Sequence, residues 1–105
     1  MKTVTIADHI NYSSEKMKKN NLFEGEHLFT DLYCFEPGQA QKTHTHDNSD
    51  KVYIVQKGEG TFKVGVESTV LKKGMATIAR AGEPHGVKNH SDKQLTVLVI
   101  MAPKP

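Results

Sequence analysis

The sequence predicts an all-β fold, a sandwich or a barrel, and three observations support this prediction. Helical periodicity is almost absent from the 105 residues. Segments rich in β-branched and aromatic residues recur along the chain, and each is bounded by Gly, Pro, Asn or Asp. Their even spacing is typical of sandwiches and barrels rather than of alternating βαβ units. The predicted strands are Leu28–Phe35, Val52–Gln56, Thr61–Val66, Ala76–Ala79 and Leu95–Met101.

The segments between these strands contain one candidate helix and two tight turns. Ser13 or Ser14 can cap a helical turn that carries Glu15, so a short helix is predicted over Ser13–Asn20. The Glu-Pro-Gly run at 36–38 predicts a turn after the first strand, because proline fixes φ and glycine allows left-handed backbone. Two glycines at 58 and 60 predict a turn between the second and third strands. Residues 102–105 are expected to be a frayed tail.

The last predicted strand, Leu95–Met101, is apolar at every position except Thr96. A strand with apolar side chains on both faces is expected to be covered on both faces. One face would lie in the core, and the other under the N-terminal segment or under a partner subunit. A homodimer is therefore the expected assembly.

Length and charge limit what the chain can do. At 105 residues it is expected to form one domain, residues 1–105, with one modest core. The net charge is +2 and the lysines are scattered, apart from a group at 16, 18 and 19, so neither nucleic acid nor a membrane surface is an expected partner. The polar N-terminus and the single Cys34 lead us to expect a soluble cytoplasmic protein. One cysteine also excludes a zinc finger.

Three of the six histidines have the arrangement of metal ligands. His44 and His46 flank Thr45, and side chains two residues apart in a strand point the same way. His85 follows a turn in a distant segment and can complete a facial set for Zn, Fe, Mn, Ni or Cu, with coordination positions left open. Any one of these histidines alone would be read as a local hydrogen-bonding residue. The remaining histidines, at 9, 27 and 90, lack partners at ligand spacing.

Two separated motifs that contain these histidines resemble those of the cupin family. The first covers residues 38–58 and reads Gly, five residues, His44-Thr45-His46, and a closing Gly. The second covers residues 74–89 and reads Gly, five residues, Arg-Ala-Gly, two residues, His85, three residues and Asn89. Only the arginine departs from this pattern, since the family has proline there. The resemblance implies an antiparallel jelly-roll barrel of six to eight strands, with a metal inside its mouth and a small-molecule pocket beside the metal.

The fourth ligand of the family, a glutamate, is missing. Lys51 stands at its position, and an ammonium group cannot ligate a cation. Asp50 precedes it, and because neighbours in a strand alternate, only one of the two can face the interior. We favour Asp50, since residues 52 and 54 on its face are more apolar than residues 53 and 55. The predicted ligands are then His44, His46, His85 and Asp50, and a site of three histidines is equally consistent.

Three functions are compatible with such a site. The first is a metal-dependent enzyme of the dioxygenase, isomerase or decarboxylase type that acts on a small molecule. The second is a non-catalytic cupin that binds or senses a small molecule or a metal. The third is a metal-free relic in which Lys51 takes the place of the metal and bonds to protein acceptors. Asp50 and Lys51 are the main candidates for a second titratable group, with His90 a distant third, so the catalytic residues are unknown.

Overall fold

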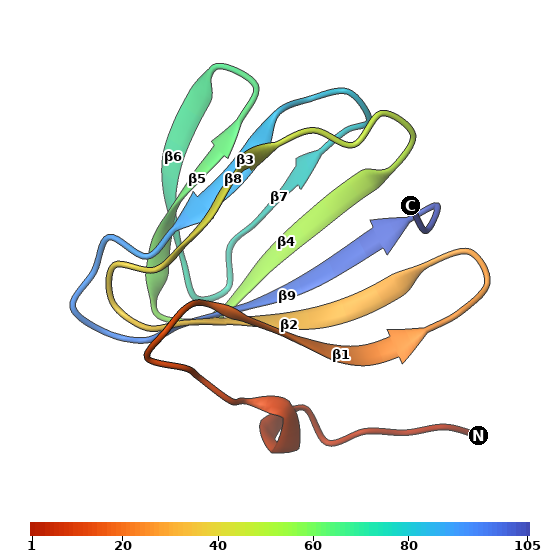
Figure 1. Cartoon of the computed structure of the whole chain (residues 1–105), viewed down its shortest axis with the longest axis horizontal. Coiled ribbons are helices and arrows are strands. Elements are labelled where there is room, and N and C mark those ends of the chain that lie inside the picture. Colours follow the sequence, from red (N-terminus) through yellow and green to blue (C-terminus); the bar gives the residue numbers. More distant parts are fainter.

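Two antiparallel sheets that face each other make up the fold (Figure 1). The structure is a computed structural model that describes residues 1–105. The first sheet contains, in spatial order, β1 (Lys18–Glu24), β2 (Phe29–Phe35), β9 (Leu95–Ala102), β4 (Asp50–Lys57) and β7 (Ala76–Ala79). The second contains β3 (Ala40–His44), β8 (His85–Lys88), β5 (Glu59–Val64) and β6 (Glu67–Lys72). One short 3₁₀ helix, η1 (Ile6–His9), precedes β1.

The predicted all-β fold is confirmed, as a single small antiparallel jelly-roll domain. All five predicted strands are present as β2, β4, β5, β7 and β9, with ends that differ by up to two residues. The chain has nine strands in total, more than the six to eight that the family resemblance implies. The sequence did not reveal β1, β3, β6 or β8, which are short or rich in Lys, Asn, Gln and Glu.

The predicted helix over Ser13–Asn20 is wrong. The segment bends near Glu15, and from Lys18 onward it forms β1, which pairs with β2. The side-chain amide of Asn20 donates hydrogen bonds to the carbonyls of His9 and Asn11, at 2.9 and 3.2 Å. Pairing with β2 thus outweighs a weak local preference for helix, as tertiary contacts commonly do.

The main core lies between the two sheets. It contains ten buried hydrophobic side chains: Tyr33, Phe35, Tyr53, Val55, Phe62, Leu71, Val87, Leu95, Val97 and Val99. Adjacent strands align these residues in rows, with Val97 of β9 opposite both Tyr33 of β2 and Val55 of β4. Each large apolar side chain that is fully buried stabilises the fold by roughly 1.5–3 kcal/mol.

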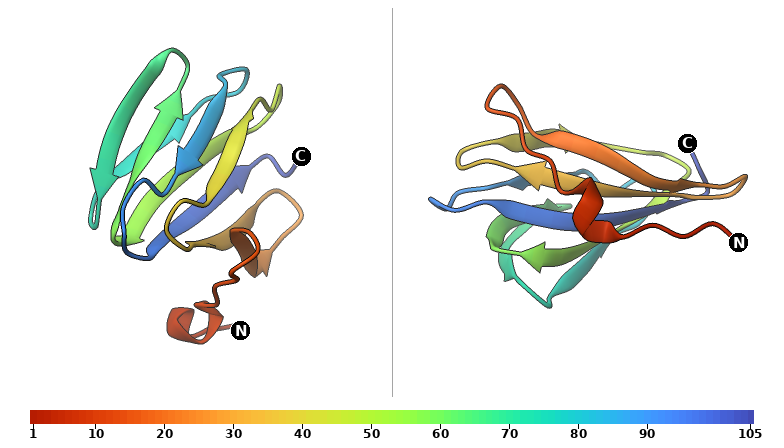
Figure 2. Two further views of the ribbon diagram at one scale, coloured as in Figure 1. Left: turned by 60° about the vertical axis from the view of Figure 1, so that its left-hand side comes forward. Right: turned by 90° about the horizontal axis from the view of Figure 1, so that it is seen from below.

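The outer face of the five-stranded sheet carries a second, smaller core. Leu22, Leu32 and Cys34 are buried there beneath Tyr12 and other side chains, and Figure 2 shows the N-terminal segment running across this side. The hydroxyls of Tyr12 and Thr96 are hydrogen-bonded at 2.6 Å. The N-terminal segment therefore covers the first part of β9, which was one of the two expected coverings. No helix of the structure has the length and apolar character needed to cross a bilayer.

Candidate metal centre

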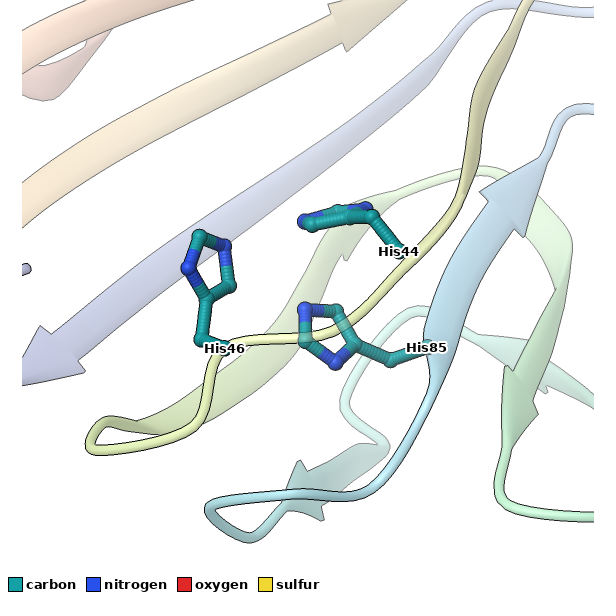
Figure 3. A group of neighbouring side chains, drawn as sticks. All are labelled: His44, His46 and His85. Atoms are coloured by element: carbon teal, nitrogen blue, oxygen red, sulfur yellow. The ribbon is translucent and has the colours of Figure 1, made fainter.

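His44, His46 and His85 converge at one end of the barrel (Figure 3). His44 ends β3, His46 follows it in the loop to β4, and His85 begins β8. Potential ligand nitrogens of the three rings all lie within 4.8 Å of one another. The structure therefore brings together the three histidines that the sequence selects.

A local irregularity between β3 and β8 positions these rings. His44 pairs with His85 and Gln41 pairs with Val87, so β3 has one more residue than β8 over this stretch. Such a bulge changes the direction in which the following side chain points. The two backbones are close here, because a Cβ added to Gly86 would lie 3.0 Å from the Gln41 carbonyl oxygen and from the Thr43 nitrogen. A side chain at this position would require the neighbouring backbone to shift by a few tenths of an ångström.

Backbone carbonyls fix the orientation of two rings. Nδ1 of His44 lies 2.8 Å from the carbonyl oxygen of Lys42, and Nδ1 of His85 lies 2.9 Å from that of Glu83. A carbonyl only accepts, so Nδ1 carries the proton and donates in both rings. Nε2 is then left with a free lone pair, which is the arrangement seen in histidines that ligate metals.

The second nitrogen of His85 lacks a protein partner. His85 is buried, with 1% of its surface exposed, and its Nε2 is the single buried side-chain nitrogen or oxygen without a hydrogen bond. Leaving such an atom unsatisfied costs about 1–3 kcal/mol. A cation bound to this lone pair would satisfy it, so the residues present fit a metal ion.

All three imidazoles are neutral at physiological pH, the form that binds metals. Burial is the largest cause that lowers the pKa of His44, His46 and His85, and for His85 it brings the pKa to about 4. The positive charge of Lys51 adds to this effect at each ring. Three neutral nitrogen donors suit Zn, Fe, Ni or Cu better than Mg or Ca, which prefer oxygen.

The expected inward orientation of Asp50 is wrong. Asp50 is exposed, and its Oδ1 accepts a hydrogen bond of 2.9 Å from the backbone N–H of Ala81. Lys51 faces the interior instead and is 1% exposed, in line with Tyr53 and Val55. Residues 52 and 54 were expected to face inward with Asp50 because they are the more apolar pair, but the outer face of this sheet is also apolar. Tyr53 takes the inner position, where its ring centroid lies 5.4 Å from that of Phe62 in the facing sheet.

A buried polar network surrounds Lys51. Its Nζ donates to Oε1 of Gln41 at 3.3 Å and lies 5.0 and 5.2 Å from the ring centroids of Tyr33 and Tyr53. Tyr53 donates its hydroxyl to the same Oε1 at 3.2 Å, and Gln41 donates its amide to the Tyr33 hydroxyl at 3.2 Å. Burial, reinforced by Lys19, lowers the pKa of Lys51 to about 7. Burial also raises the pKa of Tyr33 to about 12.

Other residues considered from the sequence lie away from this centre. His90 is exposed and bonds to the Thr61 hydroxyl at 2.8 Å. Asn89 is fully buried and donates to the carbonyls of Phe35 and Lys93, at 3.3 and 2.7 Å, so it holds the connection from β8 to β9. Gln41 was not identified from the sequence, since a polar residue in a polar strand gives no sign of burial.

Comparisons with known proteins agree with this fold. A family model described as a cupin domain matches residues 31–101. An uncharacterised protein of Streptomyces coelicolor is 34% identical over 74 residues, which cover 69% of this chain and 67% of that protein. The crystal structure of TT1209 from Thermus thermophilus is 45% identical, with a TM-score of 0.97 and 100% of both chains covered. A protein of Klebsiella pneumoniae with a double-stranded β-helix domain shares the fold, with a TM-score of 0.90 at 22% identity over 98% of this chain and 90% of that one.

Proposed function

This chain belongs to the cupin family, and on that premise we propose that His44, His46 and His85 bind one divalent transition metal ion. A small molecule is then bound beside the metal, inside the barrel. The observation that carries the proposal is the buried, unsatisfied Nε2 of His85 in a cluster of three neutral imidazoles. Asp50 is not included among the ligands, because it is exposed and bonded to the backbone of residue 81.

The metal-free alternative is less well supported. In that alternative Lys51 replaces the metal and bonds to protein acceptors, and its ammonium group does donate to Gln41. It makes no hydrogen bond to any of the three histidines, however, and Nε2 of His85 stays unsatisfied. An ammonium in the place of the metal would be expected to donate to that nitrogen.

Two roles follow from such a centre. A metal bound by three histidines keeps open positions and can polarise an oxygen atom of a bound molecule, as enzymes of the dioxygenase, isomerase and decarboxylase types require. Lys51, with a pKa of about 7, would then hold or release a proton. The hydroxyls of Tyr33 and Tyr53, whose pKa values burial raises, would stay protonated and orient the substrate. The alternative role is a binding or sensing module, which the histidine cluster favours because it contains no carboxylate base and leaves Lys51 to move a proton.

Assembly and location complete the proposal. Half-buried apolar side chains of β4 and β9, among them Ile54 and Ile100, lie on the outer face of the five-stranded sheet and support a homodimer. The free, buried thiol of Cys34 supports a cytoplasmic location, because reducing compartments keep thiols unpaired.

Metal-dependent stabilisation tests the proposal. Chelator-treated wild type is melted with and without Zn, Fe, Mn, Ni or Cu, beside His46→Ala, His85→Ala and the control His90→Ala. A metal at a hundredfold excess over its Kd stabilises a protein by about 2.7 kcal/mol, so the wild type and His90→Ala should gain several degrees in Tm. The two site variants should gain little. If no metal raises the Tm of the wild type, the proposed metal centre is wrong.

A further inference from the structure

The interior of the barrel contains a buried lysine, Lys51, whose charged form has no counter-ion. The two ion pairs of the structure, His90 with Glu59 and Lys104 with Glu24, lie at the surface and do not involve Lys51. An ammonium group has three donors, and the one hydrogen bond from Lys51 goes to the neutral amide oxygen of Gln41. Burying a charge in this way is unfavourable unless a partner of opposite charge is present.

Nearby charges do not remove this imbalance. Nζ of Lys19 lies 5.5 Å from the ring centroid of Tyr33, the same ring that Lys51 approaches at 5.0 Å. The carboxylate of Asp31 acts electrostatically on Lys51, but its Oδ1 accepts from the Asn21 amide at 2.8 Å and it forms no ion pair with either lysine. A divalent ion on three neutral imidazoles would add further positive charge. No acidic side chain forms an ion pair with Lys51, so a bound anion is the group that would supply the pairing charge.

A basic groove lies next to this buried network and shares Gln41 with it. It has a volume of about 510 Å³ and lies between β1 and β3, which are edge strands of the two sheets (Figure 1). The residues that line it are Lys16, Met17, Lys18, Lys19, Ala40 and Gln41. Three of the six are lysines and none is acidic, so the groove attracts anions. Gln41 connects the groove to Lys51, because its side chain is hydrogen-bonded to the Lys51 ammonium.

We propose that the barrel binds a small organic anion through this groove, with a carboxylate of the anion paired to Nζ of Lys51. The inference rests on the proposed function, since it names the class of small molecule that lies beside the metal. The hydroxyls of Tyr33 and Tyr53 already engage Gln41, so the network around the ammonium is ordered before the anion arrives. Lys51 thus takes the place of the family's glutamate as a binding group for the ligand and not for the metal.

A carboxylate suits the Lys51 ammonium and the basic groove better than a phosphate does. Phosphates are commonly bound at helix N-termini or by forked arginine contacts. This chain has no α-helix, and its single arginine, Arg80, is exposed after β7 and does not line the groove. One buried ammonium matches the single charge of one carboxylate.

The test is calorimetric titration with malonate, the neutral malonamide and inorganic phosphate, on both chelator-treated and metal-loaded protein. The variants are Lys51→Met, which keeps the side-chain length without the charge, Lys19→Met, and the control Lys63→Met on an exposed position of β5. We expect malonate to bind the wild type and Lys63→Met equally, and at least tenfold more weakly to Lys51→Met. Lys19→Met should weaken binding severalfold, and malonamide should not bind.

Equal malonate affinity in the wild type and Lys51→Met would overturn the inference, as would no malonate binding in either metal state, or phosphate binding more tightly than malonate. Circular dichroism of each variant ensures that a loss of binding is not a loss of folding. The outcome separates the two proposals. If malonate binding depends on Lys51 but the protein takes up no metal, only the proposed metal centre is contradicted. If the protein binds metal but Lys51→Met does not change the malonate affinity, only the proposed anion site is contradicted.

Discussion

At the scale of single residues, Lys51 is the most unusual feature of the barrel. Its ammonium is buried between two tyrosine rings, near Lys19 and Asp31, and burial is the main cause that lowers its pKa from 10.5 to about 7. The unfolded chain therefore holds a proton on this lysine over a pH range in which the folded chain has lost it. The free energy of unfolding therefore rises with pH between about 7 and 10.5. Below about pH 7 the lysine is charged in both states, and the cost of burying its charge is fully present.

This linkage predicts how Lys51→Met changes stability. Each unit of pKa difference corresponds to about 1.4 kcal/mol, so the variant should be more stable than the wild type near neutral pH by a few kcal/mol. The difference should shrink as the pH approaches about 9.5, below the range where the tyrosines titrate. Urea unfolding at several pH values measures it, with Lys63→Met as the control. Parallel pH profiles for the wild type and Lys51→Met would show that Lys51 is not a buried, strained cation.

At the scale of elements, the close approach of β3 and β8 at Gly86 holds His44 opposite His85. A Cβ at Gly86 would meet the backbone of β3 at 3.0 Å, so Gly86→Ala requires that backbone to shift by a few tenths of an ångström. Overpacking of this kind costs about 1–3 kcal/mol. We also expect the metal affinity to fall by roughly tenfold, as for other changes that misalign ligands from outside the ligand set.

The matched control for that variant is Gly25→Ala. At Gly25 the nearest atom to an added Cβ is the carbonyl oxygen of Leu28, at an ordinary contact distance of 3.7 Å. The metal affinity is measured by titrating both variants with Zn and recording the Tm at each Zn concentration. An unchanged metal affinity in Gly86→Ala would mean that the approach of the strands does not position the histidines.

The strands that the sequence predicts correctly are those with dense apolar and β-branched side chains, such as β9. Strands such as β1 and β3 are polar because they lie at sheet edges, and pairing with a neighbour rather than their own composition makes them strands. The histidines could be found because the spacing of His44 and His46 is local. The orientation of Lys51 could not, because it depends on the outer face of the sheet being apolar too.

At the scale of the whole molecule, the outer face of the five-stranded sheet has more apolar surface than the N-terminal segment covers. Val52, Ile54, Leu98 and Ile100 form adjacent half-buried rows on β4 and β9. We expect a homodimer built on this face, so light scattering should give twice the mass of the chain. Ile100→Glu should shift the protein to the monomer, whereas Val70→Glu, on the exposed side of β6, should not. A monomeric wild type at high concentration would contradict this assembly.

The whole account depends on a metal held by His44, His46 and His85, and elemental analysis of protein purified without chelator or nickel affinity resin tests it most directly. The account predicts about one transition metal ion per chain in the wild type and in His90→Ala, with loss of the metal in His44→Ala and His85→Ala. A wild type that contains no metal, and takes up none when reconstituted with Zn, Fe, Mn, Ni or Cu, would contradict it.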